Sequence, residues 1–295
     1  MLKNKMRIAC IIMAHKEPGQ IEQFLKRFAG HPFDFFIHLD KKINSKPFEY
    51  LGEMPQVYFI KKRTEVRWAS YNFLAALFQS ISEVLACGIE YEFISVMSGQ
   101  DYPIKPVSSI YHHLEKNPGR NFICYEENTE WWAHAITRII KYHFTNFGFR
   151  GRYRLQFLLN RLLPARKFPL PYKLYGGPRA MCMTLSAECA RYIVTFMQTH
   201  KELRRFMQYT WGPDEILIPT LIMNSAFKET VINNNFYFID WTEGGSNPKI
   251  LKLEDFDSLL HSDKLLARKF DVQVDPKILT RIDEVIFDLG TGKLF

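Results

Sequence analysis

Apolar positions in the first hundred residues fall into two alternating kinds of segment. Short runs rich in isoleucine, valine and phenylalanine, each ending in a polar cluster, predict strands at residues 7–13, 33–39, 57–60 and 92–97. Apolar residues at helical spacing predict helices at 20–29 and 70–85. Continuous apolar strands separated by helices are typical of a mainly parallel sheet covered by helices on both faces. The expected fold class is therefore α/β and Rossmann-like.

The pattern changes from about residue 172. A Gly-Gly-Pro turn begins at Gly176, and it precedes a predicted strand at 180–185 and a helix opened by Ser186. Further along, the pattern predicts helices at 216–223 and 276–287 and a strand at 236–241. A chain of 295 residues that is 47% hydrophobic can bury a large core, so we expect a single large domain over residues 1–295.

The net charge of +8 is concentrated in one segment. Residues 131–187 contain no aspartate or glutamate, and the basic residues there are Arg138, Lys141, Arg150, Arg152, Arg154, Arg161, Arg166, Lys167, Lys173 and Arg179. Such a segment attracts anions, which could be a nucleotide diphosphate, an acidic lipid surface or a nucleic acid. Apolar residues interleave with the arginines between 149 and 163. A basic amphipathic helix on an anionic membrane and a solvated basic face packed on its own leucines are both compatible with this pattern.

Other features indicate a cytoplasmic protein. No window approaches the roughly 20 apolar residues of a membrane span, and the first residues lack the apolar run of a signal peptide. The 5 cysteines are odd in number and widely spaced, which favours buried free thiols over disulfides or a zinc site. His38 lies in an apolar strand and is expected to be a hydrogen-bonded core histidine.

Ligands of parallel α/β sheets bind beyond the carboxyl ends of the strands. The polar residues that follow the predicted strands are His15, Lys16, Asp40, Lys41, Lys42, Ser98, Gln100 and Asp101. Asp40 could accept hydrogen bonds from a ribose or a base, and the alternative is that it only caps a turn.

The sequence Tyr209-Thr-Trp-Gly-Pro-Asp-Glu215 places a carboxylate where the helix at 216–223 begins. Asp214 and Glu215 are neighbours, so on a helix they point about 100° apart and form a poor pair for glycoside hydrolysis. One carboxylate acting alone suits a general base, which makes Glu215 the candidate catalytic residue. The alternative is that these acids only complement the helix dipole.

Two further motifs concern anion and metal binding. Asp255-Phe-Asp257 is the only Asp-x-Asp sequence, and its polar, helix-like context indicates a surface position and not a metal site. A metal-free phosphate site needs cationic side chains, and the adjacent Arg268 and Lys269 are candidates because a guanidinium can hold phosphate oxygens bidentately. A solvated surface pair is the alternative for these two residues.

A series of motifs, in order from about residue 7 to residue 285, resembles the core-2/I-branching enzymes and peptide O-xylosyltransferases, glycosyltransferase family 14. The motifs are Val66-Arg-Trp-Ala-Ser70, Phe93-Ile-Ser-Val-Met-Ser-Gly-Gln-Asp-Tyr-Pro-Ile104, Trp211-Gly-Pro-Asp-Glu215, Asp240-Trp241 and Ala267-Arg-Lys-Phe-Asp271. Each piece is weak alone, whereas the combination is specific.

The resemblance implies a GT-A-type fold and an inverting, metal-independent transfer from a UDP-sugar to a hydroxyl of a glycan, forming a β-linkage. N-acetylglucosamine is the first expectation for the sugar and xylose the second. Residues of about 1–125 would form a nucleotide-binding half, and about 126–295 an acceptor-binding and catalytic half. The implied roles are a general base for Glu215, donor binding for Asp40, Trp68, Arg268 and Lys269, and acceptor binding for Trp241, Asp101, Glu130, Arg138 and Lys141.

The chain departs from the family's animal members, because it shows neither their Golgi signal anchor nor their disulfides. These departures favour a bacterial-type cytoplasmic enzyme of surface polysaccharide synthesis, held at the inner face of the membrane by its basic segment and acting on a glycan or lipid-linked glycan. No nucleic acid partner is expected, since the basic residues match no nucleic-acid module. The alternatives are a basic anion- or polysaccharide-binding protein without catalysis, a UDP-sugar hydrolase and a retaining transferase.

Overall fold

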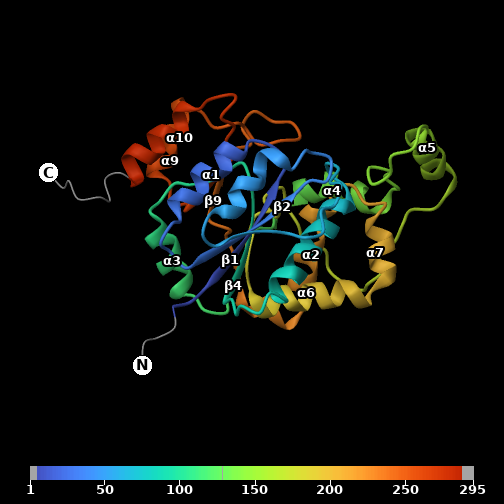
Figure 1. The fold of residues 1–295 in the computed structure, drawn as a ribbon. Helices are drawn as coiled ribbons and strands as arrows, with labels where there is room; N and C mark the ends of the chain where they lie inside the picture. Colours follow the sequence, from blue (N-terminus) through green and yellow to red (C-terminus); the bar gives the residue numbers. More distant parts are fainter. Residues whose placement is uncertain (1–4, 128, 288–295) are drawn as a thin grey trace.

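The computed structural model describes residues 5–127 and 129–287, and its main feature is a seven-stranded sheet of order β3-β2-β1-β4-β7-β6-β8 (Figure 1). The strands are β1 (Ile8–Ala14), β2 (Phe33–Leu39), β3 (Val57–Phe59), β4 (Phe93–Ser98), β6 (Asn121–Ile123), β7 (Met183–Ser186) and β8 (Val231–Asn233). The four strands β3, β2, β1 and β4 are parallel. The predicted α/β class and mainly parallel sheet are confirmed, with β7 as the strand that runs antiparallel to both β4 and β6.

A three-stranded sheet of order β5-β10-β9 adjoins the large one. It consists of β5 (Asp101–Pro103), β9 (Tyr237–Ile239) and β10 (Leu266–Arg268), and β10 pairs antiparallel with β5 and parallel with β9. This sheet brings segments from far apart in the sequence together. Each sheet contains strands from before and after residue 125, so the two predicted halves are not structurally separate. The assignment of nucleotide binding to one half and of acceptor binding and catalysis to the other stays a prediction.

The helices are α1 (Pro18–Arg27), α2 (Tyr71–Leu85), α3 (Val107–Glu115), α4 (Thr129–Ile140), α5 (Arg152–Leu162), α6 (Ala187–Thr199), α7 (Lys201–Met207), α8 (Leu217–Met223), α9 (Phe256–His261) and α10 (Lys277–Ile282). Short 3₁₀ turns span Lys46–Glu53, Pro213–Glu215, Ala226–Thr230 and Leu253–Asp255, and a π-helical turn at Asp283–Phe287 follows α10. The predicted helix at 276–287 is therefore shorter and irregular at its end. Ser186 opens α6 as predicted, because its hydroxyl accepts the backbone N–H of Cys189 at 3.2 Å.

Strand β1 separates two hydrophobic clusters. Its even-numbered residues, beginning with Ile8, pack in a cluster that includes α1, α3 and α10. Its odd-numbered residues, beginning with Ala9, pack in a second cluster with α2, α6 and α8. Every residue of β1 and β2 is buried, which explains why their sequences are continuously apolar. Helices on both faces of the sheet are thus confirmed.

The cysteines are free, as predicted, but they are not all buried. Cys10, Cys182 and Cys189 are buried, Cys124 is half-buried, and Cys87 is exposed in the turn after α2. His38 is buried, and its Nε2 accepts the backbone N–H of Thr64 at 3.1 Å. Within the described part of the chain, no helix combines the length and the apolar character needed to cross a bilayer.

Candidate active site

A cavity of about 450 Å³ opens beyond the carboxyl ends of β1, β2 and β4, where the sequence predicted a ligand site. Its volume lies within the range of small-molecule sites. Among the predicted site residues, those lining it are Asp40, Trp68, Glu215, Trp241, Arg268 and Lys269. The fold therefore brings the candidate base and the candidate cation pair to one cavity, although they are far apart in the sequence.

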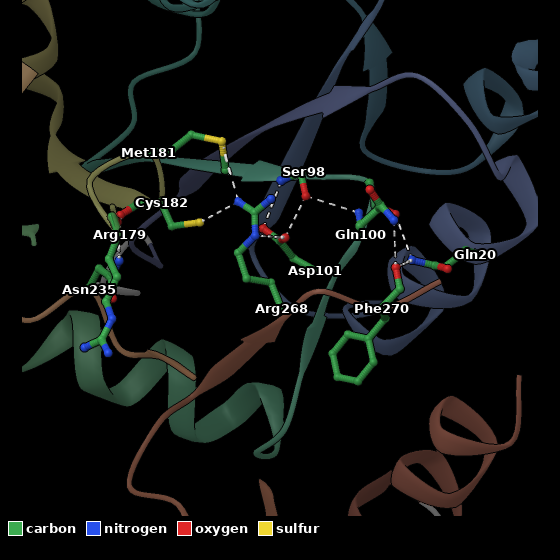
Figure 2. A network of polar contacts seen from close by, with 11 residues as sticks. Gln20, Ser98, Gln100, Asp101, Arg179, Met181, Cys182, Asn235, Arg268 and Phe270 are labelled. Carbon is green, nitrogen blue, oxygen red and sulfur yellow. Dashed lines mark hydrogen bonds and ion pairs between the residues drawn. The ribbon is translucent and has the colours of Figure 1, made fainter. Parts of the chain in front are cut away.

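Arg268 lies at the end of β10 with its guanidinium held in the cavity wall (Figure 2). Its Nε is 3.7 Å from Oδ1 of Asp101, and its Nη1 is 3.2 Å from the sulfur of Cys182. Asp101 also accepts the backbone N–H of Ser98 at 2.9 Å and the Ser98 hydroxyl at 2.6 Å. Arg268 is therefore positioned by a buried carboxylate, and a solvated surface pair is excluded for it.

The structure does not support the predicted acceptor contact of Asp101. The Asp101 side chain is 0% exposed and does not line the cavity. Asp101 begins β5, and its carboxylate contacts Ser98 and the guanidinium of Arg268 (Figure 2). Its position makes Asp101 a residue that holds Arg268.

Lys269 lies between Arg268 and Phe270, and the Phe270 backbone is held by two glutamine side chains. The carbonyl of Phe270 accepts the side-chain amides of Gln20 at 3.3 Å and Gln100 at 3.0 Å (Figure 2). Burial and the neighbouring charges of Arg268 and Lys16 lower the pKa of Lys269. Because an anion in the cavity would favour the protonated ammonium, this site is electrostatically suited to a negatively charged ligand.

Asp40 lies directly after β2 and is almost fully buried. Its Oδ1 accepts the backbone N–H of Lys42 at 3.0 Å and that of Val66 at 3.3 Å. The turn-capping alternative is therefore observed. Asp40 nevertheless lines the cavity, so its predicted contact with a nucleoside stays a prediction.

The backbone at Glu215 is fixed by the Gly-Gly sequence. The N–H of Gly177 donates to the carbonyl of Glu215 at 2.9 Å. A β-carbon at Gly176 would lie 2.4 Å from that same carbonyl oxygen, so only glycine fits there. The 3₁₀ turn Pro213–Glu215 then presents the carboxylate to the cavity just before α8.

The Glu215 carboxylate forms an ion pair with Arg138 from α4. Burial raises the pKa of Glu215, and the charge and hydrogen bond of Arg138 oppose that rise. The guanidinium of Arg138 also lies 4.2 Å from the ring centre of Trp211. For Asp214, burial and then the neighbouring Glu215 raise the pKa to about 7. This pair of carboxyls therefore sits in an environment that resists charge, which is characteristic of acid–base groups.

A second, wider cleft of about 1030 Å³ adjoins the cavity. Trp68 and Trp211 border both spaces, and their rings meet edge to face at 5.2 Å. Arg138 lines the cleft, so it stands between the cleft and Glu215. Trp68 is 57% exposed, so its side chain can contact a ligand in either space.

Two predicted acceptor residues lie elsewhere. Glu130 is exposed on the first turn of α4, and Lys141 is exposed just beyond the end of that helix. Neither lines the cavity or the cleft, and the carbonyl of Lys141 accepts Nη1 of Arg166 at 2.9 Å. The structure thus does not support acceptor binding by these two side chains, since Arg138 alone of the three lines the cleft.

The sequence model of the Core-2/I-branching enzymes matches residues 8–260. The chain belongs to the Core-2/I-branching enzyme family. Its membership confirms the resemblance drawn from the motifs, and this is a family of glycosyltransferases.

Curated relatives of this Core-2/I-branching family member are xylosyltransferases. Xylosyltransferase oxt of Drosophila melanogaster is 21% identical over 327 residues, which cover 98% of this chain and 34% of that protein. Xylosyltransferase 2 of Homo sapiens is 25% identical over 303 residues, which cover 94% of this chain and 33% of that protein. The chain thus spans about a third of the length of these relatives.

Solved structures show only distant overall similarity to this family member. Mouse xyloside xylosyltransferase 1 has a TM-score of 0.40 and 10% identity, covering 89% of this chain and 96% of that one. A galactosyltransferase, LgtC, has a TM-score of 0.45 and 8% identity, covering 95% of this chain and 96% of that one. The family assignment depends on the sequence match alone.

Other residues of the site were not singled out individually from the sequence. Arg67 and Trp211 lie within the family motifs and line both spaces, so the motifs carried a signal for them. Arg179 and the 246–248 loop also line the cavity, and nothing in the local pattern distinguishes them.

In the part of the chain that the structure describes, no group of three or more His, Cys, Asp or Glu residues could hold a metal ion. In the Asp-x-Asp motif, Asp257 is exposed as predicted, whereas Asp255 is half-buried and bound to Lys249 at 2.7 Å.

Proposed function

We propose that the protein is an inverting glycosyltransferase that moves a sugar from a UDP-sugar to a hydroxyl of a glycan and forms a β-linkage. The observation that carries the proposal is the cavity shared by Glu215 and the Arg268–Lys269 pair. A transferase of this kind needs a base for the acceptor and cations for the leaving diphosphate, and the cavity offers both. N-acetylglucosamine is the first candidate sugar and xylose the second.

In the proposed reaction, Glu215 takes the proton of the acceptor hydroxyl while that oxygen attacks the anomeric carbon from the side opposite UDP. A new bond forms from the acceptor oxygen to the anomeric carbon, and the bond from that carbon to the UDP phosphate oxygen breaks. The electron pair leaves with UDP, and Arg268 and Lys269 stabilise the growing negative charge. The raised pKa of Glu215 supports this role, because a base works best when its pKa approaches the working pH.

Metal independence is part of the same proposal. Arg268, with its position fixed by Asp101, would hold phosphate oxygens through a planar guanidinium, and Lys269 would add a point charge. Arg179 and Lys42 line the same cavity and add further positive charge. These side chains would take the place of a divalent cation at the diphosphate.

The biological setting that we propose is surface polysaccharide synthesis in a bacterium. The enzyme would work in the cytoplasm at the inner face of the membrane, with a glycan or lipid-linked glycan as its acceptor. The support for this setting is the basic segment between residues 131 and 187, which contains no acidic residue.

Nucleotide binding is tested by thermal unfolding with UDP, GDP, CDP and several UDP-sugars, each with and without EDTA. A ligand at a hundred times its dissociation constant stabilises the folded protein by about 2.7 kcal/mol, so the melting temperature is expected to rise by several degrees with UDP and to keep that rise in EDTA. A response lost in EDTA would contradict metal independence. No response to any nucleotide would favour a basic anion- or polysaccharide-binding protein without catalysis.

Replacing Arg138 with glutamine tests its effect on the proposed base. Arg138 lowers the pKa of Glu215 against the effect of burial, so its removal should raise that pKa further. A general base acts when deprotonated, and the acid limb of the profile of kcat/KM against pH is therefore expected to move to higher pH. An acid limb that stays in place or moves to lower pH would show that the activity does not depend on a base paired with Arg138.

A further inference from the structure

Three polar residues of helix α5 lie on the side that faces the protein. Arg152, Gln156 and Asn160 recur every four residues, so they form one stripe along the helix. This stripe holds the backbone of the 142–147 loop: Gln156 accepts one N–H at 2.9 Å, and Asn160 accepts one at 2.7 Å and donates to a carbonyl at 2.8 Å. Arg152 donates to a further carbonyl of the loop. The helix is thus attached to the protein by hydrogen bonds.

The outward side of α5 is apolar. Phe157 and Leu162 are each 68% exposed, Tyr153 is 57% exposed and Leu158 is 49% exposed. No residue of the helix is buried. A helix of a globular protein normally turns its apolar stripe to the core, so this arrangement is reversed. Figure 1 shows α5 standing away from the main body.

The same face is positively charged. Arg154 and Arg161 are exposed between the apolar residues of the helix, and Arg150 and Lys167 are exposed just before and after it. The sequence from 131 to 187 has no carboxylate that could neutralise them. Neither Arg154 nor Arg161 has an ion-pair partner among the residues that the structure describes. Apolar side chains combined with such cations match the interfacial zone of an anionic bilayer, where acyl chains meet phosphate headgroups.

We propose that the outward face of α5, with residues 149–163, is a docking surface for an anionic membrane. Phe157 and Leu162 enter the boundary between headgroups and acyl chains, and Arg154 and Arg161 contact lipid phosphates. A second copy of this chain fits the face less well, because a symmetric contact between two α5 helices would bring their arginines together. The charge of the face therefore favours lipid over a dimer.

Docking in this way also defines the class of acceptor. Arg152, Tyr153 and Gln156 of α5 line the wide cleft, and Trp68 and Trp211 border both the cleft and the cavity of Glu215. A membrane held against α5 lies beside the mouth of that cleft. The acceptor is then a glycan joined to a membrane lipid. This conclusion about the acceptor depends on the proposed glycosyl transfer, whereas the docking surface does not.

The test is flotation of the protein with vesicles of phosphatidylcholine alone and of phosphatidylcholine with phosphatidylglycerol, at low and high salt. We expect binding to the anionic vesicles that weakens with salt. The double variant Arg154→Gln/Arg161→Gln should bind about 25-fold more weakly, since each basic residue near such a surface contributes about fivefold. Phe157→Ser/Leu162→Ser should lose at least about tenfold. The matched control Leu253→Ser/Val274→Ser alters two other exposed apolar residues and should bind normally.

Two kinds of result would overturn the docking surface. One is no binding of the unaltered protein to anionic vesicles, and the other is equal binding by the Phe157→Ser/Leu162→Ser variant. A dimer in solution that this variant dissociates, without vesicle binding, would assign the face to a second copy instead. The rise in melting temperature with UDP is measured for each variant and reports on the cavity alone. If the protein binds vesicles but its melting temperature does not respond to any nucleotide, the docking surface is retained and the proposed transferase is rejected.

Discussion

Replacing Glu215 with glutamine is expected to lower kcat by about 10²- to 10⁴-fold while the protein folds and binds UDP normally. Glutamine keeps the size of the side chain and can still accept a hydrogen bond from Arg138, but it cannot take a proton. The backbone contact of Glu215 with Gly177 is unaffected, because it uses the main-chain carbonyl. The measurement is the initial rate of sugar transfer, together with the UDP-dependent rise in melting temperature.

Glu130→Gln is the matched control for this experiment. Glu130→Gln is the same chemical change, but Glu130 is exposed and lines neither the cavity nor the cleft. Its substitution is expected to leave kcat within about twofold of the unaltered protein. Near-normal turnover of Glu215→Gln, or an equal loss in both variants, would show that Glu215 is not the base.

Several of the longer elements could be predicted from the sequence, whereas the helices α3 and α4 were not. Strands β1 and β2 are buried on both faces, so their continuous apolar runs are a direct signature of a parallel sheet. Strands β5, β6, β8 and β10 were not predicted, and each is three residues long without a recognisable period. The position of Arg268 depends on two of these short strands, β5 and β10, which places its geometry beyond the reach of pattern analysis.

The direction in which a side chain points could not be obtained from the sequence. The strand-end rule correctly placed Asp40 at the cavity, but it also selected Asp101, which begins a new strand and is buried. For α5, the sequence predicted an amphipathic helix without showing which face meets the protein. That choice is made by hydrogen bonds from Gln156 and Asn160 to a distant loop, and such partners are unknown until the chain is folded.

The motif around Glu215 identified the carboxylate but not its environment. Arg138 was predicted to touch the acceptor, and the structure places its guanidinium on Glu215 itself and over Trp211. The contribution of Arg138 to the charge state of Glu215 arises from a contact between α4 and the turn before α8. Local sequence therefore located the candidate base, and tertiary structure is needed to explain how its pKa is set.

Replacing Arg268 with glutamine is expected to impair both stability and transfer. Arg268 is the cation beside Asp101, whose side chain is 0% exposed. Its removal leaves a buried carboxylate whose one remaining partner among the described residues is Ser98. Breaking a buried pair in this way costs roughly 3 kcal/mol of the free energy of unfolding. Loss of a cation at the leaving phosphate should lower kcat by about 10²- to 10³-fold.

A double variant separates these two effects. Arg268→Gln/Asp101→Asn removes both charges, so most of the lost stability should return, measured as the midpoint of urea unfolding. Sugar transfer and UDP binding should remain impaired, because the guanidinium is still absent. Lys269→Met should weaken UDP binding and leave the midpoint of urea unfolding nearly unchanged. The reason is that Lys269 has no ion-pair partner among the described residues. Recovery of transfer in the double variant would show that Arg268 acts only by supporting the fold, and the diphosphate would then have to be held elsewhere in the cavity.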